Sequence, residues 1–403
     1  MPSGRRPAQW HEIEKEPTID DQTPRLESGP DASTDLHGGK RKADKPKGEQ
    51  RNFLVRHKWL TGIVASLLAL VLAAGGWLLY LNSQLGDISN FLGPDSTLAD
   101  EDRPERPDND SMNILIAGAD NGENDGDGVS TEEALAAEEW QPGLLRSDTI
   151  MFVHIPANRK AAYLVSIPRD SYVTIYDENG DPQGEDKINA AFATYGPTGY
   201  TATVEQLTGL RMDHLAVIDW TGFKEISTAL GGVEVYIPDA FYDSSQKIQW
   251  DQGYETLQGD TALAYVRTRY GLEEGDFDRI ARQQNFLRAM MEKMLDQGVF
   301  SDLFTFKNML QALVQNLSVD DGFSTGEIRG LALSMRGLSS DDVTFLTAPL
   351  GTYDRTPSGA SIVRLDERQS QALWDSIAND EMDKYLKRYG EEAGELQGDR
   401  NVD

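Results

Sequence analysis

Short apolar runs rich in β-branched and aromatic residues alternate with longer amphipathic segments over most of residues 111–379. The segments 223–230 and 278–297 repeat their apolar residues with the helical period. A short polar link joins 149–155 to 161–167, too short for a crossover helix, which predicts an antiparallel pair. Helices alternating with strands predict an α/β domain whose sheet is covered by helices. The expected strands are 112–118, 149–155, 161–167, 214–220, 233–237, 262–268 and 342–348.

One apolar run, from Trp59 to Leu81, contains no charged residue. A helix of this length rises roughly 35 Å, enough to cross a hydrocarbon core of about 30 Å. Trp59, Trp77 and Tyr80 lie near its ends, where aromatic rings prefer the membrane interface. A signal peptide is the alternative, but this run is longer than a typical signal and follows a long polar segment. We therefore predict one transmembrane helix over 59–81.

Charge is distributed unevenly around this run. Residues 40–58 hold eight Lys and Arg against two Asp and Glu, whereas residues 82–110 hold two against eight. Because positive flanks stay in the cytoplasm, we expect a cytoplasmic N-terminus, a single pass and an extracellular domain at the cell membrane. The net charge of −29 arises entirely beyond residue 81, which argues against nucleic-acid binding. The chain has no cysteine, so the exported part folds without disulfides.

Five segments follow from these patterns. Residues 1–58 are rich in polar, Pro and Gly residues and predict a disordered cytoplasmic tail, followed by the helix over 59–81. Residues 82–110 predict a stiff, charged extracellular stalk. A folded extracellular domain is expected over 111–379, and an acidic C-terminal tail over 380–403.

Polar residues collect where the expected strands end. Asp120 follows the first strand, Arg146 and Asp148 precede the second, and Arg169 and Asp170 follow the third. In an open sheet such ends line the crevice where ligands bind. Exposed strand ends are also polar simply because they meet water, and that interpretation stays open for each residue singly.

The segment 265–284, YVRTRYGLEEGDFDRIARQQ, is unusually basic for this acidic chain. On a strand over 262–268, Arg267 and Arg269 would project to the same face. On the helix that follows, Asp276, Arg279 and Gln283 fall on or beside an apolar stripe, whereas Arg282 falls on the outer arc and is expected near solvent. Inward charge is costly unless it is paired or binds a ligand. The stripe consists of Ile280, Leu287, Met291 and Met294.

These residue types predict a site for a phosphorylated ligand. Two carboxylates, Asp120 and Asp148, suit a hard cation such as Mg²⁺. The guanidinium of an arginine can bind two phosphate oxygens at once. A purely structural network of Arg and Asp is the alternative. Outside the membrane the chain has only His154 and His214, which argues against a zinc site or a Ser/His/Asp hydrolase.

Seven ordered motifs resemble the LytR-CpsA-Psr family of cell-wall glycopolymer ligases. The resemblance covers about residues 111–375, and the pair YVRTR and DFDRIARQ at this spacing is its most specific part. The single N-terminal anchor also matches the family's architecture. The motifs are NILIAGAD, RSDTIMFVHI, VSIPRDSYV, KINAAFATYG, ALGGVEVYIPDA, LQGDTALAYVRTR and DFDRIARQQ.

The resemblance implies an α/β/α sandwich whose central mixed sheet encloses an apolar tunnel for a polyprenyl chain. It implies a phosphotransferase that moves a phosphoglycan from a polyprenyl-pyrophosphate carrier to a peptidoglycan or surface-protein hydroxyl, with a possible pyrophosphatase side activity. Asp120 and Asp148 match the positions of the Mg²⁺ (or Mn²⁺) ligands. Asp276 matches the carboxylate among the arginines, and is either the base or an orienting group. The pyrophosphate-contacting positions are matched by Arg146, Arg169, Arg267, Arg269, Arg279 and Gln283.

Two alternatives remain open at this point. A membrane-anchored binding or regulatory protein would use the same site to sequester lipid-linked pyrophosphate glycans without transferring them. The acidic insertion over 121–145 is either a lid or acceptor-docking loop, or a solvated loop with no such role, the latter being favoured. The sequence identifies neither the glycan nor the acceptor.

Overall fold

The computed structural model describes residues 88–390, apart from 121–129, 138, 269–275 and 297–302. The chain divides into a unit over Met1–Leu67 and a unit over Leu68–Asp403, and all described residues belong to the second. The expected tail over 1–58 and the expected membrane helix over 59–81 lie outside the described residues. Within the described ranges, no helix combines the length and the apolar composition that a membrane span requires.

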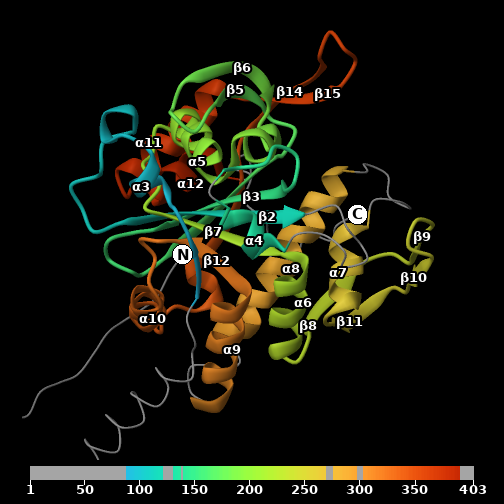
Figure 1. The fold of residues 1–403 in the computed structure, drawn as a ribbon. Coiled ribbons are helices and arrows are strands. Elements are labelled where there is room, and N and C mark those ends of the chain that lie inside the picture. The colour runs from blue at the N-terminus through green and yellow to red at the C-terminus, as the bar shows by residue number, and fades with distance from the viewer. Residues whose placement is uncertain (1–87, 121–129, 138, 269–275, 297–302, 391–403) are drawn as a thin grey trace, which may run out of the picture. The chain divides into compact units, whose positions relative to one another are not determined.

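A seven-stranded mixed sheet forms the centre of the described unit (Figure 1). The pairs β1/β12, β7/β2 and β4/β13 are parallel, and the other neighbours are antiparallel. The antiparallel pairing expected for 149–155 and 161–167 is confirmed. Across the sheet the strands are β1 (Ser89–Phe91), β12 (Leu317–Asp320), β7 (His214–Asp219), β2 (Met112–Asp120), β3 (Arg146–Ile155), β4 (Ala162–Ile167) and β13 (Val343–Thr347).

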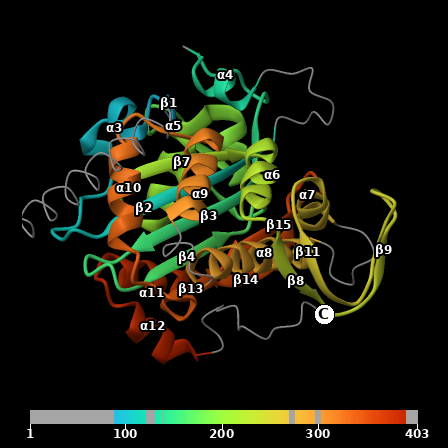
Figure 2. The ribbon, with the colours of Figure 1, turned by 90° about the horizontal axis from the view of Figure 1, so that it is seen from below.

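Helices cover both faces of this sheet, which makes three layers (Figures 1 and 2). One face carries α5 (Asn189–Thr208), α11 (Glu367–Ala378) and α12 (Met382–Tyr389). The other carries α6 (Trp220–Ala229), α8 (Asp276–Asp296), α9 (Leu303–Asn316) and α10 (Thr325–Ser334), with α7 (Asp260–Arg267) beside α6 and α8. The expected α/β/α fold with a central mixed sheet is confirmed.

The strands are apolar on both faces because both faces are covered. Successive side chains of a strand point to opposite sides. Leu115 of β2 accordingly belongs to the apolar cluster of Phe192 and Trp374, from α5 and α11. Its neighbour Ile114 belongs to the cluster on the other face, which includes Leu287 of α8.

Two-stranded hairpins and short helices surround the three layers. The short helices α3 (Pro94–Thr97) and α4 (Thr131–Leu135) precede β2 and β3, and 3₁₀ turns span Asp100–Asp102 and Ser340–Asp342. The hairpins pair β5 (Tyr172–Tyr176) with β6 (Pro182–Lys187), β9 (Phe241–Asp243) with β10 (Ile248–Trp250), and β14 (Leu350–Arg355) with β15 (Ser361–Leu365). A further two-stranded sheet pairs β8 (Val233–Ile237) with β11 (Gly253–Leu257), which flank the β9–β10 hairpin in the chain.

The strand expected over 262–268 is wrong, because these residues form α7. Ala262, Tyr265 and Val266 are buried, and their spacing of three and four residues places them on one helical face. Alanine favours helix more than any other residue, and a run this short does not distinguish the two states by its pattern. Arg267 therefore ends a helix, and its expected common strand face with Arg269 does not exist.

The stalk expected over 82–110 is wrong for residues 88–110, which fold onto the domain. Their strand β1 pairs with β12, and Arg103 is buried. The Arg103 guanidinium donates to both Glu205 carboxylate oxygens at 2.6–3.2 Å. The Arg103 Nη2 also donates to the Met212 carbonyl. The sequence pattern predicted a solvated stalk because the segment is charged. The buried partner of Arg103 is Glu205, which lies 102 residues away in the chain and is not visible from the local pattern.

The acidic tail expected over 380–403 begins too early, because α12 packs into the core. Met382 and Tyr385 are buried, and Leu386 and Tyr389 pack beside them at the three- and four-residue spacing of one helical face. The solvated loop favoured for 121–145 is also wrong in its described part. Leu135 of α4 is buried in the core, and the Trp140 indole donates to the Ala193 carbonyl of α5 at 3.2 Å.

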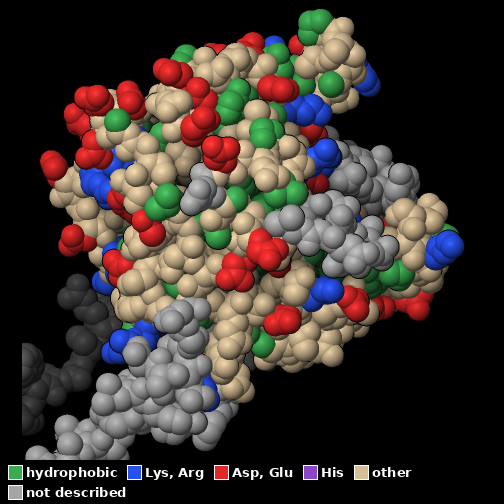
Figure 3. Space-filling view, viewed as in Figure 1, with side chains coloured by type: hydrophobic (Ala, Val, Ile, Leu, Met, Phe, Trp, Pro, Cys, Tyr) green, Lys and Arg blue, Asp and Glu red, His purple; other side chains and the backbone are tan. Residues whose placement is uncertain are grey.

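Carboxylates dominate the charged surface of the described unit. Figure 3 shows acidic side chains spread over most of the face in view, with basic ones in smaller groups. This agrees with 57 Asp and Glu against 26 Lys and Arg beyond residue 81. Basic side chains that gather at one place therefore stand out against the rest of the surface.

Candidate functional site

One end of the sheet gathers the strand ends that carry the predicted site residues. β2 and β7 run parallel, and β3 runs antiparallel to both β2 and β4. The carboxyl ends of β2, β4 and β7 therefore meet the amino end of β3 at a common edge, which we call the site end. Asp120 ends β2 opposite Arg146, the first residue of β3, and Arg169 follows β4.

A β-bulge positions Asp148 at the site end. Gly118 pairs with Thr149 and Ala119 pairs with Ser147, so Asp148 has no register partner on β2. Bulges of this kind twist a strand locally and change the direction of a side chain. At Gly118, an added Cβ would lie 2.8 Å from the Thr149 Cβ, so only glycine allows the two strands to approach this closely.

Asp148 and Arg169 form an ion pair across neighbouring strands. The Arg169 Nη1 lies 2.9 Å from the Asp148 Oδ2, and the two side chains are 17% and 19% exposed. The Lys187 ammonium lies 2.7 Å from the next carboxylate, Asp170. Charge-assisted contacts of this length are strong, and a partly buried setting strengthens them further. The site end therefore holds ordered charges of both signs, with Arg146 exposed at its rim.

Helices α7 and α8 bring a second group of predicted residues to the site end. The Arg267 guanidinium lies 5.4 Å from the centre of the Trp220 ring, and Trp220 follows the last residue of β7. The Gln283 carboxamide lies between the Thr149 hydroxyl at 3.5 Å and the Val266 carbonyl at 3.4 Å. Gln283 thus joins β3 to the end of α7.

Three predicted site residues have side chains outside the described part of the structure. Arg269 lies outside the described residues, and so do the side chains of Asp276 and Arg279, although both belong to α8. Their assignment to the site stays a prediction.

Arg282 is buried, so the expectation that it lies near solvent is wrong. It is 4% exposed, and its guanidinium lies 4.4 Å from the Phe241 ring and 5.7 Å from the Tyr265 ring. Burial raises the pKa of the Tyr265 hydroxyl, and the adjacent Arg282 charge opposes that rise. The physical reason is a second apolar face of α8, continued by Phe286 and Met290 and covered by the paired strands β8 and β11 and by α7.

The arrangement suits binding of a polyanion. Asp120 and Asp148 stand close to arginines from β3 and the turn after β4. Arg267 of α7 lies over the Trp220 ring at the same end of the sheet. Within the described part of the chain, no group of three or more His, Cys, Asp or Glu side chains is placed to hold a metal by itself. Sequence reasoning missed Trp220 and Thr149, because their roles depend on the partners Arg267 and Gln283.

Comparison with known proteins identifies relatives of this fold. LcpA of Corynebacterium glutamicum, a cell wall biosynthesis protein, is 30% identical over 295 residues, which is 66% of this chain and 55% of LcpA. The chain thus spans about half the length of that relative. TagT of Bacillus subtilis, named polyisoprenyl-teichoic acid–peptidoglycan teichoic acid transferase, is 29% identical over 80% of this chain and 94% of TagT.

The solved structure of TagT bound to LIIa-WTA superposes with a TM-score of 0.51 and 26% identity, covering 70% of this chain and 98% of that one. The family model described as LytR_cpsA_psr matches residues 87–379. The match begins close to β1 and ends at the last residue of the predicted catalytic domain. This match covers most of the chain and nearly all of the described unit. The chain therefore belongs to the LytR-CpsA-Psr family.

Proposed function

We propose that this protein is a membrane-anchored extracellular phosphotransferase. It would move a phosphoglycan from a polyprenyl-pyrophosphate carrier to an acceptor hydroxyl of the cell wall or of a surface protein. The observation that carries the proposal is the convergence of Asp120, Arg146, Asp148 and Arg169 at the site end, joined there by Arg267. The names of LcpA and TagT support a role in assembling cell-wall polymers.

The arginines account for recognition of the pyrophosphate. A guanidinium presents its N–H groups in a planar fork that matches two phosphate oxygens. Arg169 is held in place by Asp148 at 2.9 Å, and Arg267 lies over the Trp220 ring, so both are ordered before a ligand arrives. Pre-ordered cations bind an anion at a lower entropic cost, because their own side chains need no further ordering. A polyprenyl chain would lie against apolar side chains between the sheet and α8.

The residues present fit a hard divalent cation. Mg²⁺ uses one or two protein carboxylates and completes its shell with water and ligand phosphate oxygens, and Mn²⁺ accepts the same donors. Asp120 and Asp148 would hold it, since they stand at the ends of paired strands beside the bulge. When bound, the cation would neutralise charge on the pyrophosphate.

The chain's own residues would position the reacting groups. In phosphoryl transfer the acceptor oxygen forms a bond to the phosphorus bearing the glycan, while the bond from that phosphorus to the oxygen of the leaving polyprenyl phosphate breaks. Arg169 and Arg267 would stabilise the charge that develops on the leaving phosphate, which needs no reorganisation if they are already ordered. Asp276 would either accept the hydroxyl proton or orient the neighbouring arginines.

Release of polyprenyl phosphate tests this proposal. The full-length protein in detergent is given a short-chain polyprenyl-pyrophosphate glycan and a peptidoglycan fragment as acceptor, with and without Mg²⁺, and the released lipid phosphate is quantified. We expect Asp120→Asn and Asp148→Asn to lower this release about a hundredfold or more, because each removes a charge needed in the transition state. Asp341→Asn is the matched control, since Asp341 is exposed in a 3₁₀ turn away from the site end.

The same assay separates transfer from simple binding. A protein that only sequesters lipid-linked glycan would bind the substrate and release no polyprenyl phosphate. Release that does not depend on Mg²⁺, or that survives both substitutions, would refute the cation site. A pyrophosphatase side activity would appear as release without acceptor, whereas transfer adds the glycan to the acceptor.

Cell-surface location is part of the proposal and has its own test. We expect protease added to intact cells to degrade an epitope placed after residue 390 and to spare one placed before residue 50. The reverse pattern would refute the predicted orientation.

A further inference from the structure

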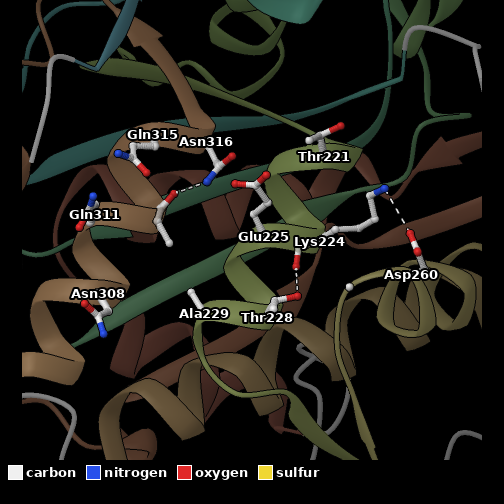
Figure 4. Close-up of a pocket in the computed structure, with 12 residues that line it drawn as sticks. Thr221, Lys224, Glu225, Thr228, Ala229, Asp260, Asn308, Gln311, Gln315 and Asn316 are labelled. Carbon is white, nitrogen blue, oxygen red and sulfur yellow. Dashed lines mark hydrogen bonds and ion pairs between the residues drawn. The ribbon is translucent and has the colours of Figure 1, made fainter. Parts of the chain in front are cut away.

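A polar groove lies between α6 and α9 (Figure 4). Its volume is about 550 Å³, within the usual range of about 300–1,000 Å³ for small-molecule sites. Asn308, Gln311, Gln315 and Asn316 line it from α9. The spacing of three, four and seven residues places Asn308, Gln311 and Gln315 on one face of that helix.

This composition is unusual for an exposed helical face, which ordinarily carries Glu and Lys. In a chain with 26% charged residues, the α9 side of the groove instead carries four carboxamides. The Asn316 amide donates to the Ala312 carbonyl at 2.8 Å. The carboxamides of Asn308, Gln311 and Gln315 line the groove without a hydrogen bond to another described residue.

The opposite wall supplies polar groups at matching intervals. Glu225 and Thr228 of α6 line the groove, and the Lys224 ammonium lies 3.2 Å from the Asp260 carboxylate at the start of α7. With its one lysine paired, the groove has no excess of positive charge, which argues against a phosphate ligand. It also lacks the large apolar side chains that a polyprenyl chain would contact.

One end of the groove adjoins the site end. Thr221, which lines it, follows Trp220, and the Trp220 ring lies under Arg267. There α6 and α9 approach closely, since an added Cβ at Gly222 would lie 2.5 Å from the Asn316 carbonyl oxygen. A chain bound along the groove would therefore lead toward the reacting groups.

We propose that this groove binds the acceptor as a neutral chain of N-acetylated sugars, an inference that rests on the proposed transfer to a cell-wall glycan. Sugar hydroxyls and acetamido groups both donate and accept hydrogen bonds. A carboxamide does the same, with two N–H donors and a carbonyl acceptor, whereas carboxylates and ammonium groups do only one. The row of carboxamides on α9 thus complements a polar, uncharged ligand better than a charged one.

Binding of chitotetraose, a chain of four N-acetylglucosamine units, tests the inference by calorimetry on the full-length protein in detergent. The double variant Gln311→Ala/Gln315→Ala should bind chitotetraose about tenfold more weakly or worse, since it loses two sets of hydrogen bonds. Maltotetraose, which lacks acetamido groups, should bind more weakly than chitotetraose to the unmodified protein. Gln371→Ala is the matched control, because Gln371 is an exposed glutamine on α11, on the other face of the sheet.

A transfer assay assigns the bound glycan to the acceptor. The double variant should show a raised KM for a chitotetraose acceptor and an unchanged rate of acceptor-independent polyprenyl phosphate release. A raised KM for the lipid-linked donor would overturn the inference, because the groove would then hold the donor glycan. Equal binding by variant and unmodified protein, or no binding by either, would overturn it too. If the unmodified protein binds chitotetraose in the groove but releases no polyprenyl phosphate, the proposed function is refuted and sugar binding by the groove is not.

Discussion

Arg282 offers a sharp test of how α8 is oriented. Its guanidinium is enclosed by the Phe241 ring of β9 at 4.4 Å and the Tyr265 ring of α7 at 5.7 Å, and only 4% of the residue is exposed. A cation over an aromatic ring contributes about 2 kcal/mol when it is desolvated. Arg282 thus connects α8 to two neighbouring elements.

Replacing Arg282 by alanine should destabilise the domain by about 3 kcal/mol. The nearer cation–π contact accounts for about 2 kcal/mol, and the farther one for about 0.5 kcal/mol. Loss of the buried methylene groups adds about 0.8 kcal/mol each, while relief of the buried charge offsets part of the total. Arg282→Met retains most of the apolar packing and should cost about half as much.

Urea unfolding of the full-length protein in detergent, followed by tryptophan fluorescence, measures the difference. Arg288→Ala is the control on the same helix, because Arg288 pairs with Glu292 one turn away at a partly exposed position. Such a pair contributes under about 0.5 kcal/mol. Equal unfolding midpoints for Arg282→Ala and Arg288→Ala would refute the burial of Arg282 and the rotation of α8 that follows from it.

Three further perturbations probe other parts of the domain. Glu205→Ala should cost about 3–5 kcal/mol in urea unfolding, since it removes the buried carboxylate that pairs with Arg103, whereas Arg106→Ala, at an exposed pair, should cost under about 1 kcal/mol. Burial alone would raise the pKa of the Asp243 carboxyl, but hydrogen bonds donated by Gln246 and Ser245, the largest effect coming from the Gln246 side chain, lower it to about 2. Because this pKa lies below the unfolded value, Asp243 should contribute about 1–2 kcal/mol above about pH 4, and its difference in stability from Asp243→Asn should vanish as the pH falls to about 2. Gly118→Val should distort the bulge and abolish polyprenyl phosphate release with little change in helix content by circular dichroism; full release would refute the close approach at this position.

Local sequence information determined the strands and helices whose residues are buried in a regular pattern. The runs over 112–118, 149–155 and 161–167 became β2, β3 and β4, because β-branched and aromatic residues favour strands wherever both faces are covered. The period of 278–297 likewise predicted α8 within two residues at each end. Polar residues at strand ends pointed to Asp148 and Arg169, which the structure joins.

Tertiary structure alone decided which side chains those elements bury. The single apolar stripe in the sequence predicted that Arg282 faces solvent. In the structure α8 has a second covered face, and no local pattern identifies the elements that cover it. Arg103 looked like part of a solvated stalk, and only the fold brings Glu205 to it. The segment ending at Arg267 became a helix because its neighbours bury one helical face. Periodicity reports the preference of a segment by itself, whereas burial depends on partners that lie far away in the chain, and these partners set the geometry of the site.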